Sequence, residues 1–69
     1  MGRSEDGHQS LRDRLRDCSE ALGDRAIELL REAMQTKDPD VRAGFAALEK
    51  RMTRARRAVE KAIGLLDGD

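Results

Sequence analysis

The sequence is poor in the residues that most functional sites use. Its 69 residues include no tryptophan or tyrosine and only one phenylalanine, one proline and one cysteine. Without aromatic side chains on which bases can stack, single-stranded nucleic acid is a poor candidate ligand. The lone Cys18 excludes an internal disulfide. Together with the polar segment 1–10, it leads us to expect a reduced, cytoplasmic protein.

Groups that carry chemistry are equally scarce. His8 is the single histidine and has no companion at a useful spacing. No cysteine pair for zinc, no glycine-rich phosphate loop and no Glu-x-x-His pattern of a di-metal bundle is present. No stretch of 18 apolar residues occurs, so we expect no membrane span. The sequence therefore predicts no catalytic residues, no cofactor and no metal, and the protein is not expected to be an enzyme.

What the chain does contain is helix-forming, evenly charged sequence. Fourteen basic residues balance fourteen acidic ones, and charged residues make up 41% of the total. Zero net charge disfavours both a polycation that coats nucleic acid and disorder driven by repulsion. Alanine, leucine, arginine and glutamate dominate, and these residues favour helix. The sequence therefore predicts the all-α class.

The clearest element is a helix over residues 39–66. Asp38 is a suitable N-cap, Pro39 suits the first helical position, and Asp40 suits the first turn. Apolar residues then recur at alternating steps of four and three, which is a heptad pattern that requires a partner helix. These seam residues are Val41, Phe45, Leu48, Met52, Ala55, Val59, Ala62 and Leu66. The small residues Ala55 and Ala62 would let a neighbouring backbone approach closely.

A second helix is predicted over residues 11–35, with a turn at 36–38. Residues 1–9 lack periodicity and are expected to form a disordered tail, and residues 67–69 a frayed end. The apolar positions of this helix follow an 11-residue repeat, which keeps its apolar face nearly straight. The repeat comprises Leu11, Leu15, Cys18, Leu22, Ala26, Leu29 and Ala33. A break at Gly23, giving a three-helix bundle, is the alternative.

Two helices of similar length joined by a short turn predict an antiparallel helical hairpin. A hairpin buries only one strip of each helix, so its hydrophobic stabilisation is small compared with the entropy cost of ordering the chain. We therefore expect two hairpins to pair as a homodimeric four-helix bundle. The contributors we expect to the combined core and dimer seam are the residues of the 39–66 helix given above, with Leu15, Cys18, Leu22 and Leu29.

Each helix also carries a charged stripe. Acidic residues from Asp13 to Glu28 lie on one side of the first helix, and Lys50, Arg54, Arg57 and Lys61 lie opposite the seam of the second. We interpret both stripes as solvated surface with some lateral ion pairs between them. The basic stripe is also the possible face for a partner, either an acidic protein or the phosphates of a nucleic acid.

These features predict a small interaction module, such as an adaptor, regulator or assembly subunit, that binds itself and another protein through helix faces. The alternative is a bundle that binds RNA or DNA through the basic face of residues 50–61. A helical-hairpin dimer with a basic outer face is similar in architecture to the Rop family of small RNA-binding bundles. That resemblance is one of shape and size, and it assigns no residue a role. Cys18 is interpreted as an inert buried hydrophobe, with an intersubunit disulfide as the alternative.

Overall fold

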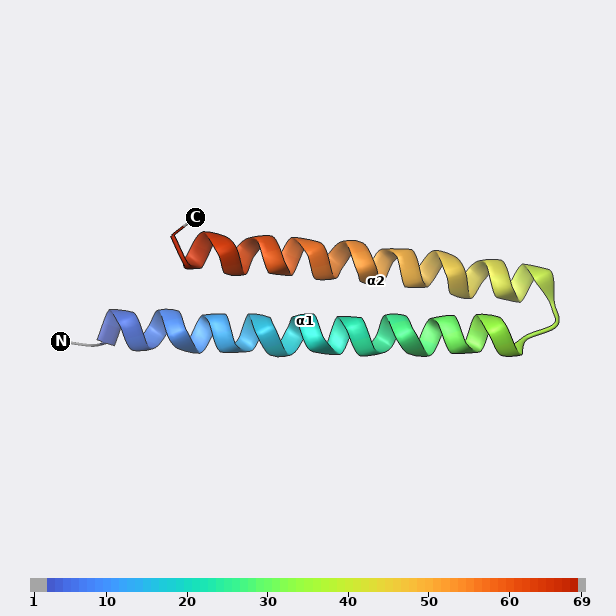
Figure 1. Ribbon diagram of the computed structural model, residues 1–69, viewed down its shortest axis with the longest axis horizontal. Helices are drawn as coiled ribbons and strands as arrows, with labels where there is room; N and C mark the ends of the chain where they lie inside the picture. Colours follow the sequence, from blue (N-terminus) through green and yellow to red (C-terminus); the bar gives the residue numbers. More distant parts are fainter. Residues whose placement is uncertain (1–2, 69) are drawn as a thin grey trace.

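The protein is a hairpin of two long helices that lie side by side and run in opposite directions (Figure 1). The computed structural model describes the backbone of residues 3–68 and the side chains of residues 7 and 9–68. Helix α1 spans Arg3–Gln35 and helix α2 spans Pro39–Leu66. The molecule is elongated, with extents of 58 × 17 × 10 Å. The predicted all-α class and hairpin are confirmed.

Helix α1 continues through Gly23 without a break, so the three-helix alternative is wrong. An interior glycine costs only about 1 kcal/mol relative to alanine, which is too little to end a helix whose apolar face continues on both sides. The helix also begins at Arg3, so residues 3–9 are helical where a disordered tail was expected. The only proline of the chain is Pro39, so no proline interrupts the helix between residues 3 and 9. Residues 1 and 2 lie outside the described part.

The turn between the helices is held by local polar contacts. The Asp38 carboxylate accepts hydrogen bonds from the backbone N–H groups of Asp40, at 2.9 Å, and Val41, at 3.4 Å. Pro39 occupies the start of α2, where its missing N–H is not needed. The Arg42 guanidinium donates to the Thr36 carbonyl oxygen at 2.8 Å. This hydrogen bond therefore ties the C-terminal end of α1 to the N-terminal end of α2.

The cap at Asp38 gives a prediction for stability. Replacement of Asp38 by alanine removes the acceptor for two otherwise unpaired N–H groups, and we expect it to lower the free energy of unfolding by about 1 kcal/mol. Asparagine caps helices about as well as aspartate, so Asp38→Asn is the matched control and should change stability little. Urea denaturation of both variants measures the difference. Equal losses in the two variants would exclude capping as the cause.

The contact line on α1 has heptad spacing. The residues from 9 to 36 that are at least half-buried are Gly23 and the series Arg12, Leu15, Ser19, Leu22, Ala26, Leu29, Ala33 and Thr36. Two helices that stay in contact along their length require this 3.5-residue period, so the 11-residue repeat does not describe the buried face. Leu11 and Cys18, which belong to that repeat, are exposed.

The hairpin has little core of its own. Among the described side chains, the buried apolar residues are Ala26, Leu29 and Ala33, all on α1, and Leu29 alone is fully buried, with 1% exposed. No described residue of α2 is buried. Phe45, Met52, Val59 and Leu66, which form one line along α2, are half-buried. Helix α2 is therefore covered by α1 on one side only.

Candidate interaction surfaces

The second line of the predicted seam on α2 is left open by the hairpin. Val41 and Leu48 remain 44% and 39% exposed, and the smaller Ala55 and Ala62 are half-buried. These four residues recur every seven positions, so they form a line along one side of α2. We call them the open stripe. Around its first half, Val41, Gly44, Phe45, Ala47, Leu48 and Arg51 line a shallow groove of about 430 Å³.

A parallel line of small or exposed residues borders the open stripe. It consists of Gly44, Arg51, Ala58 and Leu65, again seven residues apart, and all four are exposed. Leu65 is 66% exposed. The two lines together make a face with alternating steps of three and four, from residue 41 to residue 65. This is the pattern of a helix that packs on another helix.

Helix α1 leaves the half of this face nearest the turn exposed. On the flank of α1 that helical geometry places beside the open stripe, the positions towards the turn are Arg25, Glu28 and Glu32, and all three are exposed. Arg25 and Glu28 form an ion pair at 3.7 Å. Only at the other end of α1 do Leu11 and Cys18 bring apolar character to this flank. The open stripe is therefore longer than the apolar part of the adjacent flank of α1.

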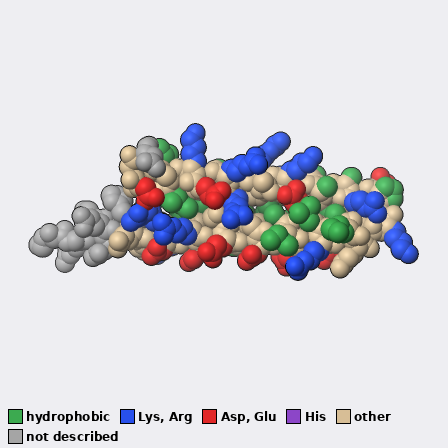
Figure 2. Space-filling model, in the orientation of Figure 1, with side chains coloured by type: hydrophobic (Ala, Val, Ile, Leu, Met, Phe, Trp, Pro, Cys, Tyr) green, Lys and Arg blue, Asp and Glu red, His purple; other side chains and the backbone are tan. Residues whose placement is uncertain are grey.

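A shorter apolar patch lies on the other flank of α1, near the turn. It consists of Ile27, Leu30 and Met34, of which Met34 is 82% exposed. Figure 2 shows apolar side chains gathered over the half of the molecule nearest the turn. The three residues have the spacing of a single helix face. We call them the turn patch.

The charged stripes lie on the outer edges of the hairpin. Figure 2 shows basic side chains along the outer edge of α2 and acidic side chains along the outer edge of α1. Lys50, Arg54 and Arg57 line one shallow depression of about 330 Å³ together with Glu49 and Thr53. Among the side chains of residues 7 and 9–68, the ion pairs are Arg12–Asp67 and Arg25–Glu28. The lateral pairs expected between the stripes are not formed by these residues.

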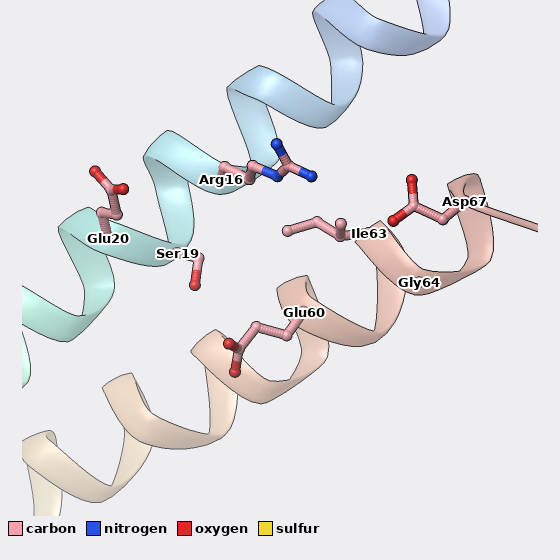
Figure 3. Close-up of a pocket in the computed structure, with 7 residues that line it drawn as sticks. All are labelled: Arg16, Ser19, Glu20, Glu60, Ile63, Gly64 and Asp67. Carbon is pink, nitrogen blue, oxygen red and sulfur yellow. The ribbon is translucent and has the colours of Figure 1, made fainter. Parts of the chain in front are cut away.

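The open end of the hairpin holds a polar groove of about 440 Å³ (Figure 3). Arg16, Ser19 and Glu20 line it from α1, and Glu60, Ile63, Gly64 and Asp67 line it from α2. The carboxylates of Glu20 and Glu60 point to different sides rather than towards one another (Figure 3). Within the described part of the chain, no three His, Cys, Asp or Glu residues are placed to hold a metal ion. The groove lacks a converging set of reactive groups.

A polar contact missed by sequence reasoning crosses the helix interface near this groove. Ser19 is buried, and its hydroxyl oxygen accepts a hydrogen bond from Arg56 Nε at 3.3 Å. The Arg56 guanidinium lies against Gly23, where an added Cβ would stand 2.8 Å from Nη1. Gly23 is therefore the residue that lets Arg56 lie across α1. Only the pairing of the two helices reveals this, because Arg56 and Ser19 are 37 residues apart.

This contact predicts a coupling between Gly23 and Arg56. In an Arg56→Ala background, Gly23→Ala should stabilise the protein by about 1 kcal/mol through helix propensity. With Arg56 present, the gain should be smaller by the cost of displacing the guanidinium from Ser19, about 0.5–1.5 kcal/mol. Urea denaturation of the four variants measures the coupling. An identical gain in both backgrounds would mean that Arg56 does not rest on Gly23 in solution.

Cys18 is exposed, so its interpretation as a buried hydrophobe is wrong for this hairpin. The neighbouring Ser19 occupies the contact line instead, because consecutive residues on a helix differ by about 100° in direction. The intersubunit disulfide stays a prediction.

Over the described residues, neither helix has a stretch long and apolar enough to cross a bilayer. No known family, characterised protein or solved structure matches the chain.

Proposed function

We propose that the protein is a non-enzymatic interaction module that works as a homodimer of hairpins, pairing as a four-helix bundle. The observation that carries this proposal is the open stripe. It belongs to the most regular apolar pattern in the sequence, and its own chain leaves Val41 and Leu48 exposed and covers Ala55 and Ala62 only in part. Exposed apolar faces of this regularity are typical of surfaces that bind other proteins.

The surface area of the chain supports self-association. The hairpin exposes 5600 Å², whereas a compact monomer of 7.7 kDa is expected to expose about 4,300 Å². The excess, roughly 1,300 Å², exceeds the ~800 Å² that each partner buries in an ordinary stable interface. Dimerisation through the open stripe would therefore remove a large part of this excess.

The remaining faces would then be free for another protein. The turn patch lies on the flank away from the open stripe, so one surface can serve the dimer while the other binds a partner. Apolar residues at steps of three and four or seven are the anchors by which helix faces recognise one another. A dimer would present two turn patches, which suits an adaptor or assembly subunit.

Sedimentation equilibrium at tens of micromolar chain concentration tests the homodimer. The expected mass is twice the 7.7 kDa of one chain. A mass of one chain at this concentration, with the helical content intact, would contradict the proposal. Reducing agent is kept in the buffer, so that oxidation of Cys18 cannot produce an apparent dimer.

The basic stripe favours a second candidate, nucleic-acid binding. Lys50, Arg54, Arg57 and Lys61 are exposed, and none forms an ion pair with another described side chain. They extend over about 16 Å along α2 at 1.5 Å per residue. A row of uncommitted cations on this scale can follow phosphates without reading bases.

Titration with duplex RNA and DNA at 50 and 200 mM salt tests this candidate. If it holds, affinity falls steeply with salt, and Arg54→Ala/Arg57→Ala lowers the slope by about two. The matched control is Arg14→Ala/Arg31→Ala, which removes two exposed cations of α1. Absence of salt-dependent binding would eliminate nucleic acid as the ligand. Equal losses in both double variants would show that the binding is not a property of the basic stripe.

A further inference from the structure

We propose that a second copy of this chain lays its α2 antiparallel along the open stripe, with Leu48 of each chain packed on the partner's Ala58. This inference rests on the proposed homodimer and adds the element and the register that form its interface.

The chemistry of the two helices selects α2 as the occupant. A covering helix has to be largely apolar over residues 41–65. The flank of α1 nearest the stripe carries the exposed charges Arg25, Glu28 and Glu32 over half of that length. Placed over Val41 and Leu48, these charges would lose their water without gaining partners there, which is costly. The α2 helix of a second copy offers a face of matching length in which Arg51 is the one charged residue, and two-fold symmetry lets the same face serve both chains.

The direction and register follow from the sizes of the side chains. When the two α2 helices overlap over their full length in opposite directions, the two lines of the face come into register. Leu48 then lies beside the partner's Ala58, Gly44 beside the partner's Ala62, and Arg51 beside the partner's Ala55. A large residue meets a small one in the Leu48–Ala58 and Arg51–Ala55 layers, which is how helix interfaces fill space without voids. The layer of Gly44 and Ala62 holds two small residues, which let the two backbones approach closely.

Other arrangements fill the same space less well. A shift of one heptad in one direction places Leu48 beside the partner's Arg51, and a shift in the other direction places it beside the partner's Leu65. Either shift also leaves one end of the stripe uncovered. A parallel pairing would set Leu48 against the partner's Leu48 and Arg51 against the partner's Arg51. Only the full antiparallel overlap therefore sets both Leu48 and Arg51 beside a small residue of the partner.

The arrangement has an electrostatic consequence. Arg51 lies on the open face and Arg54 next to it on the outer edge, close to the middle of α2. Because the two-fold axis passes through the middle of the paired helices, Arg51 and Arg54 of one chain approach those of the other. Exposed like charges within a Debye length repel, and salt screens the repulsion. We therefore expect the dimer to become tighter, not weaker, as salt rises from 50 to 500 mM.

A swap of the two facing residues tests the register. Leu48→Ala leaves a void and Ala58→Leu overfills the layer, so each should raise the dimer dissociation constant by at least about tenfold. The double variant Leu48→Ala/Ala58→Leu restores a large residue beside a small one. Its dissociation constant should return to within about threefold of the original. The matched control is Leu48→Ala/Ala43→Leu, which adds the same side chain at an exposed position outside the groove of the open stripe and should stay weak.

Sedimentation measures the dissociation constants, and circular dichroism confirms that each variant stays helical. If the protein dimerises but the double variant raises the dissociation constant by the product of the two single-variant fold-increases, the register is wrong. In that case the homodimer still stands. If the unmodified chain is monomeric at tens of micromolar, the proposed function fails as well. The salt series on the unmodified chain needs no variant. A dimer that dissociates on adding salt would also overturn this arrangement.

Discussion

Replacing Leu48 by glutamate is expected to abolish the dimer. Leu48 is the largest side chain in the middle of the open stripe, and it is 39% exposed in the single hairpin. In the proposed dimer it is enclosed by the partner's α2, where a carboxylate would lose its water and have only Arg51, three residues along the same face, near enough to pair with it. Such a burial costs several kcal/mol in each chain, and every 1.4 kcal/mol changes the dissociation constant about tenfold. We expect a weakening of at least about a thousandfold.

The matched control for this variant is Leu30→Glu. Leu30 belongs to the turn patch on the other flank and is 46% exposed, so the substitution adds the same charge at a similarly open site. Sedimentation at tens of micromolar should therefore give a monomer for Leu48→Glu and a dimer for Leu30→Glu. The assignment of the interface is contradicted if both substitutions dissociate the dimer, or if Leu30→Glu alone does so.

The largest expected loss of stability follows from Leu29→Ala. Leu29 is the one fully buried side chain among the described residues, and truncation of such a leucine costs about 2–5 kcal/mol. The whole chain is expected to be stable by only about 3–10 kcal/mol, at 0.05–0.15 kcal/mol per residue. At a fixed chain concentration, the melting temperature should fall by about 8–40 °C, at 4–8 °C per kcal/mol for a domain of this size.

The adjacent Leu30 supplies the control for this prediction. Leu30→Ala removes the same atoms one position away, but from an exposed side chain, and the expected cost is below about 1 kcal/mol. Thermal unfolding followed by circular dichroism compares the two variants. Similar melting temperatures for Leu29→Ala and Leu30→Ala would mean that the two helices do not pack through the line that contains Leu29.

The parts of the fold that follow from local signals were predictable from the sequence. The start of α2 is encoded in Asp38, Pro39 and Asp40, because capping and the geometry of proline act within a few residues. The antiparallel hairpin follows from two apolar patterns of similar length joined by that short turn. The continuity of α1 through Gly23 follows from the small cost of one interior glycine.

The parts that depend on how the helices meet were not predictable. Leu11 and Cys18 each precede a polar residue, Arg12 and Ser19. The pattern of apolar residues predicts that Leu11 and Cys18 are the buried ones. The structure buries Ser19 instead, because Arg56 from α2 gives its hydroxyl a hydrogen-bond partner. Residues 3–9 show no apolar period because α1 extends beyond the end of α2 there (Figure 1). A helix without a neighbour has no face to bury, so its sequence carries no period to detect.

Whether a second chain covers α2 is tested most directly by the dependence of thermal unfolding on concentration. If folding is coupled to pairing, mass action raises the melting temperature with chain concentration. Between 100 nM and 100 μM, we expect a steady rise of the midpoint, together with loss of helix at the lowest concentrations. A midpoint that is constant and cooperative over this whole range would show that one hairpin is stable with its apolar stripe in water.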